Sequence, residues 1–514
     1  MVWLLLDIGF SSIIFTLWKV DMNVNKICIL GGGSSGFITS SILAKYREES
    51  GLDFDIKVIY SKSIGNVGVG ESSIQNIIEL FQYLELEDSD WMKMCHATYK
   101  TSIRFENFYK KGRYFHYPFG PGDKESSVEN WCILSEKYPD IFTPERSSIF
   151  FSPHTVLSEK NKLTDQQVDG FSAYHFDTHL LGEFLKEYSE EYGVEIIDDV
   201  FVEATKNSDG SISSLVCENG IHTADLYIDC SGFKSLLLGE VMGEDYISFE
   251  NTLINNKAIV AKIPYTDKED QLKNYTNCVA LDNGWCWEIP LWDHLSVGYV
   301  HSNKFATPDE IEKELFDRYG EVEYKTVNYR TGRHKKGWVK NVVGVGLSYG
   351  FIEPLESTGI ATTLYNIFRV LEFFSKRKMK VTQIDKDLFN DAVGRNVDGY
   401  RKFVDMHYSL SSRDESQYWR YVTEEIDYQY DDRFLSQMNY HRDVQTHTSA
   451  SGDECYSGDL YVLCGMNYSL HNNVMNDDCD AQAANYFDAW VKDIEKKSEN
   501  EKSSFEYLSS KIYK

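Results

Sequence analysis

The sequence has little basic charge for its size. Its 52 lysines and arginines stand against 80 aspartates and glutamates, which gives a formal net charge of −28. A surface this acidic repels phosphates, so it argues against nucleic acid and membranes as partners. Any anion that the protein binds must be held by a local device, such as the amides at the start of a helix.

Paired cysteines are also missing. The ten cysteines are scattered, without a CxxC pair or a cluster of cysteine and histidine in the sequence. This spacing argues against a zinc site, so we expect no metal, and against a disulfide-linked secreted scaffold. A reducing cytoplasm is the compartment that fits best.

The first 21 residues differ from the rest of the chain. Residues 2–20 are largely apolar, but Asp7 interrupts them and no basic residue precedes them. They make a poor signal peptide and are marginal in length for a membrane span. We interpret 1–21 as an appended or upstream-start segment, with a membrane anchor as the alternative.

A strand, a glycine turn and a helix open the remaining chain. Residues 26–30 (KICIL) predict a strand that leads into GGGSSG at 31–36, a helix to about residue 47 and a second strand at 55–60. GxGxxG alone is a weak signal, and a plain glycine turn is the alternative. In this βαβ context it favours a dinucleotide at the helix N-terminus. Tyr60 and Ser61 stand where an acidic residue usually holds the ribose.

The same arrangement of strand and glycine turn recurs twice. Residues 225–233 predict a buried strand that ends in an acid and a glycine, and 342–347 predict another strand. A helix with apolar spacing is expected after Gly359. Such repetition is expected where a flavin lies across a sheet. Beyond about residue 385 the periodicity is mostly helical.

The segment WCWEIP at 285–290 places Trp285 and Trp287 on one side of a predicted strand. A pair of core tryptophans is the alternative, but WxWxIP resembles the signature of flavin-dependent tryptophan halogenases. Further segments resemble that family's motifs in the family's order: GGGSSG, VGVGES (67–72), ATYKTSIRF (97–105), YHFD (174–177), IDCSGF (228–233), GFIEPLESTGI (350–360) and HYSLSSRD (407–414). The resemblance covers about residues 24–420 and weakens in the last hundred residues.

The resemblance implies an α/β fold, with a Rossmann-like FAD-binding domain of the flavin monooxygenase type and an inserted or appended, mostly helical substrate-binding region. We accordingly expect FAD-binding at 22–385, with aromatic insertions that face the substrate, and a mainly helical substrate-binding region at 386–514. The residues implied in cofactor binding are Gly31, Gly33, Ser34, Ser35, Gly36, Val69, Gly70, Asp229, Gly346 and Leu347.

Two residues fall at the family's catalytic positions. Lys100 matches the catalytic lysine, whose ammonium could donate a hydrogen bond to hypohalous acid or be halogenated at nitrogen; a solvated surface lysine is the alternative. Glu356 matches the essential glutamate, which could accept the proton from a cationic ring intermediate. A glutamate that stabilises the first turn of a helix is the alternative for Glu356.

The resemblance also implies how halide and substrate are held. The halide would lie at the backbone amides of Ser357, Thr358 and Gly359, which discriminate poorly between chloride, bromide and iodide. The residues implied in separating substrate from flavin or in contacting the substrate are Trp285, Trp287, Pro354 and Phe119, with His116 or Tyr117 assisting.

The implied activity is a halogenase that uses FADH2, O2 and halide to make hypohalous acid and halogenates an indole or phenol by electrophilic substitution. Its partners would be an NAD(P)H-dependent flavin reductase and a small aromatic substrate, and a homo-oligomer is compatible with this activity. The alternatives are a flavin-dependent aromatic monooxygenase and an inactive FAD-binding protein. Trp285, Trp287 and Lys100 count against the monooxygenase, and Lys100 and Glu356 count against the inactive protein, for which the residue at Tyr60 is the one hint.

Overall fold

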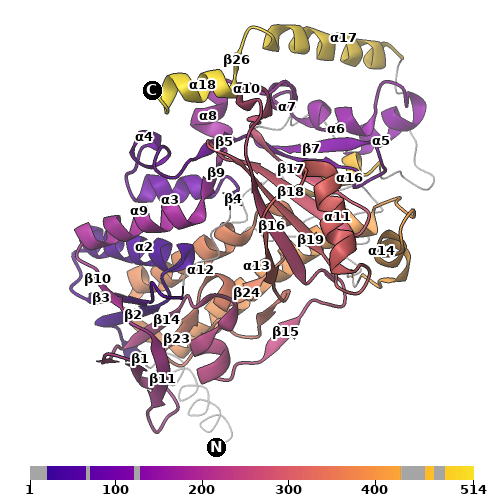
Figure 1. Ribbon diagram of the computed structural model, residues 1–514. Coiled ribbons are helices and arrows are strands. Elements are labelled where there is room, and N and C mark those ends of the chain that lie inside the picture. The colour runs from indigo at the N-terminus through magenta and orange to yellow at the C-terminus, as the bar shows by residue number, and fades with distance from the viewer. Residues whose placement is uncertain (1–19, 65–69, 121–127, 429, 431–457, 468–480) are drawn as a thin grey trace, which may run out of the picture.

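The computed structural model describes residues 20–64, 70–120, 128–428, 430, 458–467 and 481–514. Two sheets dominate the fold (Figure 1). A mostly parallel sheet lies at the lower left of the view, and a larger sheet lies toward the upper right.

The parallel sheet has six strands, and both predicted N-terminal strands are part of it. Their order is β10 (Glu195–Asp198), β3 (Asp55–Tyr60), β2 (Lys26–Leu30), β14 (Leu226–Asp229), β23 (Val342–Gly344) and β22 (Trp338–Val339). Every neighbouring pair is parallel except β22 with β23. The central strands are buried on both faces, which explains why they are continuous apolar runs rather than alternating ones.

Helices α2 (Ser34–Ser50), α9 (Thr178–Glu191) and α12 (Gly359–Arg377) pack together beside this sheet. The helix predicted to end near residue 47 continues to Ser50 and stops at Gly51, whose φ of 63° is left-handed. Glycine adopts that conformation without the steric penalty of a Cβ atom.

The second sheet has seven strands. Their order is β20 (Tyr324–Asn328), β16 (Lys257–Ile263), β19 (Leu295–His301), β18 (Gly284–Pro290), β17 (Tyr275–Ala280), β6 (Ser102–Glu106) and β7 (Tyr114–Pro118). A small sheet of β4 (Gly70–Ser72), β9 (Ala173–Asp177) and β5 (Thr98–Lys100) contacts it through β17 and β18. This contact brings residue 100 in β5 beside β17, the neighbour of the strand of the two tryptophans.

Shorter elements complete the body of the fold. The helices are α3 (Ile77–Tyr83), α4 (Asp88–Trp91), α5 (Val128–Lys137), α6 (Pro144–Phe151), α7 (Thr155–Glu159), α8 (Asp165–Phe171), α10 (Lys268–Gln271) and α11 (Pro308–Tyr319). The strands are β11 (Phe201–Lys206), β12 (Ile212–Cys217), β13 (Ile221–His222), β15 (Tyr246–Ser248), β21 (Gly332–His334) and β24 (Gly350–Phe351).

Helices dominate the described C-terminal residues, as the periodicity predicts. They are α13 (Gln383–Ser409), α14 (Gln417–Arg420), α16 (Asp459–Gly465), α17 (Ala481–Ser498) and α18 (Ser504–Lys511). The predicted boundary at 385/386 falls inside α13, and β26 (Lys502–Ser503) pairs with β8 (Lys162–Leu163). The C-terminal residues thus pack back onto the body, and the proposed domain division stays a prediction.

The N-terminal prediction needs one adjustment. Val20 and Asp21, placed in the appended segment, belong to β1 (Val20–Asn23), which pairs with β25 (Lys380–Thr382). The last two residues of 1–21 are therefore part of the fold, and 1–19 lie outside the described residues.

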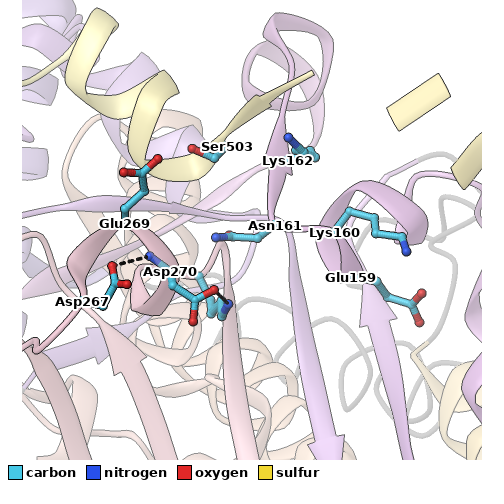
Figure 2. A pocket seen from close by; sticks show the side chains of 9 residues that line it. Glu159, Lys160, Asn161, Lys162, Asp267, Glu269, Asp270 and Ser503 are labelled. Carbon is cyan, nitrogen blue, oxygen red and sulfur yellow. Dashed lines mark hydrogen bonds and ion pairs between the residues drawn. The ribbon is translucent and has the colours of Figure 1, made fainter. Parts of the chain in front are cut away.

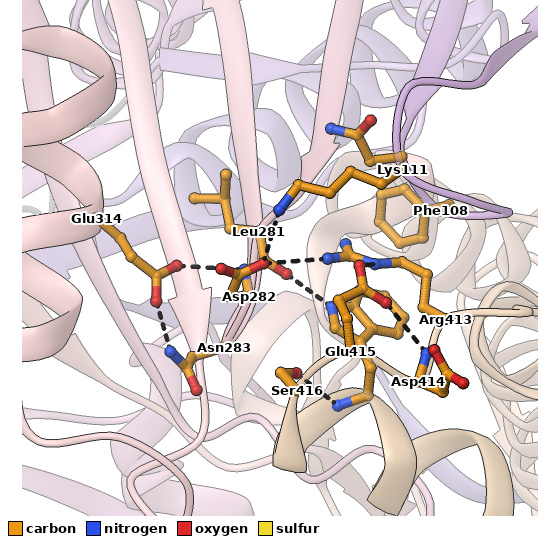
Figure 3. A network of polar contacts seen from close by, with 12 residues as sticks. Phe108, Lys111, Leu281, Asp282, Asn283, Glu314, Arg413, Asp414, Glu415 and Ser416 are labelled. Carbon is orange, nitrogen blue, oxygen red and sulfur yellow. Dashed lines mark hydrogen bonds and ion pairs between the residues drawn. The ribbon is translucent and has the colours of Figure 1, made fainter.

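A buried arginine ties the chain after α13 to the large sheet (Figure 3). Arg413 is 2% exposed and pairs with Glu415 at 2.7 Å and with Asp282 in the turn after β17 at 3.4 Å. Its guanidinium also lies 4.4 Å from the ring of Trp419. Burial of a guanidinium is tolerated because these carboxylates and the aromatic face compensate its charge.

The eight cysteines among the described residues are buried, and none of them takes part in a disulfide bond there. A search of the described helices for one long and apolar enough to cross a membrane finds none.

Trp287 depends on a glycine in the neighbouring strand. Gly298 in β19 pairs with Trp287 in β18, and a Cβ atom at Gly298 would lie 1.9 Å from the indole. We predict that Gly298→Ala lowers the free energy of unfolding by about 1–3 kcal/mol, because an added methyl group overpacks the site.

Thermal or chemical unfolding measures this effect, and indole fluorescence reports the displaced ring. Gly170→Ala is the matched control, because nothing lies within 4 Å of a Cβ atom there. Equal stability of the two variants would contradict the assigned packing.

Candidate active site

A cavity of about 840 Å³ lies where the carboxyl ends of β2, β14 and β23 meet the starts of α2 and α12. Ligands of open α/β sheets bind at this edge. Many of the residues singled out from the sequence line it: Gly31, Gly33, Ser34, Ser35, Gly70, Trp287, Gly346, Leu347, Pro354, Ser357, Thr358 and Gly359. Tyr60 and Ser61, at the expected ribose position, line it as well.

The glycine turn is built for close approach of the backbone. A Cβ atom at Gly31, whose φ is 120°, would lie 2.2 Å from the carbonyl oxygen of Cys230, and one at Gly36 would lie 2.0 Å from that of Gly31. Helix α2 follows with Gly33 as its N-cap, no side-chain cap and no acidic residue in its first turn. Its free amides therefore face the cavity and suit a phosphate-bearing ligand.

Asp229 lies outside the cavity lining and supports a loop that lines it. It is fully buried and accepts hydrogen bonds from the amides of Ser231, Leu237 and Leu238 and from the Ser231 hydroxyl. Burial raises the pKa of Asp229, and these hydrogen bonds oppose the shift. Asp229 does not itself line the cavity, but it holds the loop that does. Val69 lies outside the described residues.

Three side chains of kinds that can bind a metal lie close together in the described structure, although their spacing in the sequence matches no metal-binding motif. One ligand atom each from Asp199, Cys217 and His222 lies within 4.8 Å of the others. The Asp199 carboxylate already accepts hydrogen bonds from Val200 and Asn219. Burial raises the pKa of the Cys217 thiol to about 11, which disfavours the thiolate that binds metals.

Lys100 is fully buried at the end of β5, so the alternative of a solvated surface lysine is wrong. Its Nζ donates to the carbonyl oxygen of Ser73 at 2.8 Å and to Ser357 Oγ at 2.9 Å. It also lies 5.1 Å from the ring centre of Phe119. Burial lowers the pKa of Lys100 to about 7, against the opposing attraction of nearby acidic groups that include Glu356.

Glu356 is 1% exposed and ends a short turn, Pro354–Glu356, ahead of α12. Its Oε1 lies 2.7 Å from Nε2 of His407. Burial raises the pKa of Glu356, while the hydrogen bond and charge of His407 and the charge of Lys100 lower it. Glu356 does not cap α12 by a hydrogen bond, because α12 has Thr358 as its N-cap and no side-chain cap, and its stabilisation of the first turn through the helix dipole stays a prediction.

The segment 354–359 separates two environments. Pro354, Ser357, Thr358 and Gly359 line the large cavity, whereas Leu355 and Glu356 are buried and do not line it. Ser357 has a left-handed φ of 58°, and its hydroxyl accepts from Lys100 and donates to Ser72 Oγ at 3.1 Å. One serine therefore touches both the cavity and the buried lysine.

The two tryptophans of β18 have different surroundings. Trp287 lines the cavity, while Trp285 is fully buried beside it, with ring centres 6.1 Å apart. The Trp285 indole donates to Glu353 Oε2 at 2.9 Å. That oxygen also accepts from Tyr408 and Asn255, a network that no sequence signal singled out.

The aromatic residues predicted to assist substrate binding are buried or half-buried, and Phe119 contacts Lys100. Phe119 is 4% exposed, and Tyr117 stacks on Tyr461 with ring centres 5.4 Å apart. His116 is held by Ser102 at 2.9 Å. His407, which contacts Glu356, was present in the HYSLSSRD segment without an assigned role.

A smaller hollow of about 390 Å³ has a different character (Figure 2). Charged side chains of both signs line it, among them Glu159, Lys160, Asp267 and Asp270. None of the residues predicted for the active site takes part in it.

Comparison with known proteins gives the family. The family model for tryptophan halogenase matches residues 26–473. Tryptophan 6-halogenase SttH of Streptomyces toxytricini is 32% identical over 432 residues, which cover 77% of this chain and 80% of SttH. Tryptophan 7-halogenase RebH of Lentzea aerocolonigenes is 29% identical, over 78% of this chain and 79% of RebH.

Comparison with solved structures supports the same family. The apo structure of VirX1 has a TM-score of 0.85 at 32% identity, covering 96% of this chain and all of that one. The crystal structure of SttH has a TM-score of 0.82 at 27% identity, covering 95% of this chain and all of that one. The chain therefore belongs to the tryptophan halogenase family of flavin-dependent enzymes.

Proposed function

We propose that the protein halogenates an electron-rich aromatic compound of the indole or phenol type, with Lys100 and Glu356 as its catalytic residues. The observation that carries this proposal is the bond between Lys100 and Ser357. Ser357 lines the large cavity, so an oxidised halogen species made there has a short path to a buried ammonium. A monooxygenase has no use for such a lysine.

The large cavity is suited to FAD. Its glycine cradle, the uncapped N-terminus of α2 and its volume match a dinucleotide better than a small substrate. Reduced flavin, supplied by a separate NAD(P)H-dependent reductase, would together with O2 provide the oxidising power that turns halide into hypohalous acid. The protein itself would hold the reactants in position and keep the aromatic substrate away from the flavin.

The halide would lie at the start of α12. Helix α12 has 19 residues, begins at Gly359 and has neither a side-chain cap nor an acidic residue in its first turn. Its first amides therefore stay available to an anion. Glu71 also faces this point, because a Cβ atom at Gly359 would lie 3.7 Å from Glu71 Oε1.

Lys100 and Glu356 would have different roles in the reaction of the aromatic ring. The ammonium of Lys100 can donate a hydrogen bond to hypohalous acid and so polarise its oxygen–halogen bond. The carboxylate of Glu356 can take the proton that the ring loses when it regains aromaticity. The ring would stack on Phe119, while Trp285, Trp287 and Pro354 would keep it from the flavin.

Replacement of the lysine tests the activity. We predict that Lys100→Met lowers formation of halogenated product at least 100-fold, because the ammonium is lost, while FAD affinity stays unchanged. The assay combines protein, FAD, a flavin reductase and NADH with indoles and phenols, and supplies chloride, bromide and iodide separately. Mass spectrometry identifies the products, and a small-molecule trap measures hypohalous acid.

Lys45→Met is the matched control, because Lys45 is 4% exposed but pairs with Glu85 at 2.7 Å and does not line the cavity. Unchanged halogenation by Lys100→Met would refute the role of Lys100. Oxygenated product without any need for halide would replace the halogenase proposal with a monooxygenase.

Halide binding should depend on pH through Glu71. Burial raises the pKa of Glu71 to about 7, and Lys100 opposes the shift. As pH rises through 7 the carboxyl ionises and repels the halide, so the KM for halide should rise between pH 6 and pH 8. We predict that Glu71→Gln lowers the KM for halide at pH 8 about tenfold, the effect of about 1.4 kcal/mol of repulsion.

The KM for halide is measured at both pH values in both proteins. Lys100 loses its own charge over the same range, so the difference between the two proteins isolates the effect of Glu71. An unchanged pH dependence in Glu71→Gln would show that the carboxyl does not face the halide.

A further inference from the structure

The imidazole of His407 has no part in the chemistry described so far, although it lies inside the catalytic cluster. His407 is in α13 and is fully buried. Its Nδ1 lies 3.0 Å from the carbonyl oxygen of Phe403, and its Nε2 lies 2.7 Å from Glu356 Oε1. Both ring nitrogens are thus engaged, each with an oxygen atom.

These two contacts fix where the protons can be. A carbonyl oxygen only accepts hydrogen bonds, so Nδ1 must carry a proton. A carboxylate oxygen and an unprotonated ring nitrogen would repel each other at 2.7 Å, so this contact requires a second proton on one of the two groups. The remaining question is whether this proton belongs to the imidazole or to the carboxyl.

The position of this proton decides whether Glu356 can act as a base, because the carboxyl group is buried. A carboxyl group without water favours its neutral form, and a protonated Glu356 could not take a proton from the ring. The hydrogen bond and charge of His407 oppose this rise in the pKa of Glu356, although burial has the larger effect. Among the described residues the 2.7 Å contact with His407 engages Oε1, while no ion pair or hydrogen bond engages Oε2, so Oε2 is available to receive a proton.

We propose that His407 is the positioning residue of Glu356: as an imidazolium it donates from Nε2 to Oε1, keeps the carboxylate ionised and leaves Oε2 as the base. This inference rests on the proposed function. When the ring C–H bond breaks, its electron pair returns to the ring and its proton moves to Oε2. The pair then holds one extra proton, which passes to water after the product leaves.

Other charged and titratable groups surround the pair. Lys100 from β5 and Cys278 from β17 face Glu356, and Glu353 faces His407. Glu71 acts on the cluster through Lys100. The Glu353 carboxylate is held by hydrogen bonds from Trp285, Tyr408 and Asn255.

Aromatic rings close the cluster around the imidazole. The ring centres of Phe105 and Phe403 lie 4.7 Å and 5.4 Å from that of His407. Such an environment strengthens the hydrogen bond between the charged partners.

Two substitutions separate the charge from the hydrogen bond. His407→Gln keeps a neutral N–H donor for Glu356, and His407→Phe removes the donor. We expect His407→Phe to lower halogenation at pH 7 at least 100-fold with FAD affinity unchanged. We expect His407→Gln to move the acid limb of the pH–rate profile upward by about 1–3 units, because an opposite charge beside a carboxyl shifts its pKa by about that amount.

His334→Gln is the matched control. His334 is 2% exposed, and its Nδ1 lies 3.0 Å from a carbonyl oxygen, that of Glu244, as His407 Nδ1 does with Phe403. No ion pair between His334 and a carboxylate is found in the described structure. An acid limb of His407→Gln that coincides with those of wild type and His334→Gln would overturn the proposal, since a purely structural role lowers the rate equally at every pH.

Nitrogen NMR of protein labelled with ¹⁵N-histidine tests the proton position without any turnover. We expect both ring nitrogens of His407 to be protonated at pH 7 in wild type, and Glu356→Gln to convert the ring to the neutral Nδ1–H form. A neutral His407 in wild type at pH 7 would overturn the proposal. Failure of the wild type to halogenate any compound would count against the proposed function alone, because the NMR result does not depend on it.

Discussion

The active site depends on the mutual compensation of ionisable groups that have no water around them. Lys100, Glu356 and His407 are each at most 1% exposed, and none of them could keep a charge there alone. Burial raises the pKa of Glu356, an effect that His407 and Lys100 oppose, and burial lowers the pKa of Lys100 to about 7. The residues are therefore one unit, and the loss of any member changes the protonation of the others.

This unit is connected to the large cavity by a single short segment. Residues 354–359 present Ser357, Thr358 and Gly359 to the cavity and turn Glu356 the other way, and the left-handed backbone at Ser357 allows this reversal. Glu353, just before the segment, anchors it through three hydrogen bonds to one carboxylate oxygen. The proposed halide site and the proposed proton acceptor thus lie on opposite sides of one short segment.

The arrangement also explains why two tryptophans recur in one strand. Trp287 forms part of the cavity surface, and the space for its indole exists because residue 298 in the adjacent strand has no side chain. Trp285 supports the anchor at Glu353 instead. Alternation along a strand places both rings on one face, but the neighbouring elements give one ring a surface role and the other a supporting role.

Much of this could be predicted from the sequence, because local patterns decide it. Apolar runs and glycine turns gave the strands at 26–30 and 55–60 and the helix that begins at Gly359, and the motifs identified the family and the positions of Lys100 and Glu356. Tertiary structure alone decided the role of Asp229 as a loop anchor, the meeting of Cys217 with His222 and Asp199, and the contact between His407 and Glu356. The physical reason is that burial and hydrogen bonding depend on which elements pack together, and side chains 51 to 257 positions apart meet only once the two sheets and α13 have assembled around them.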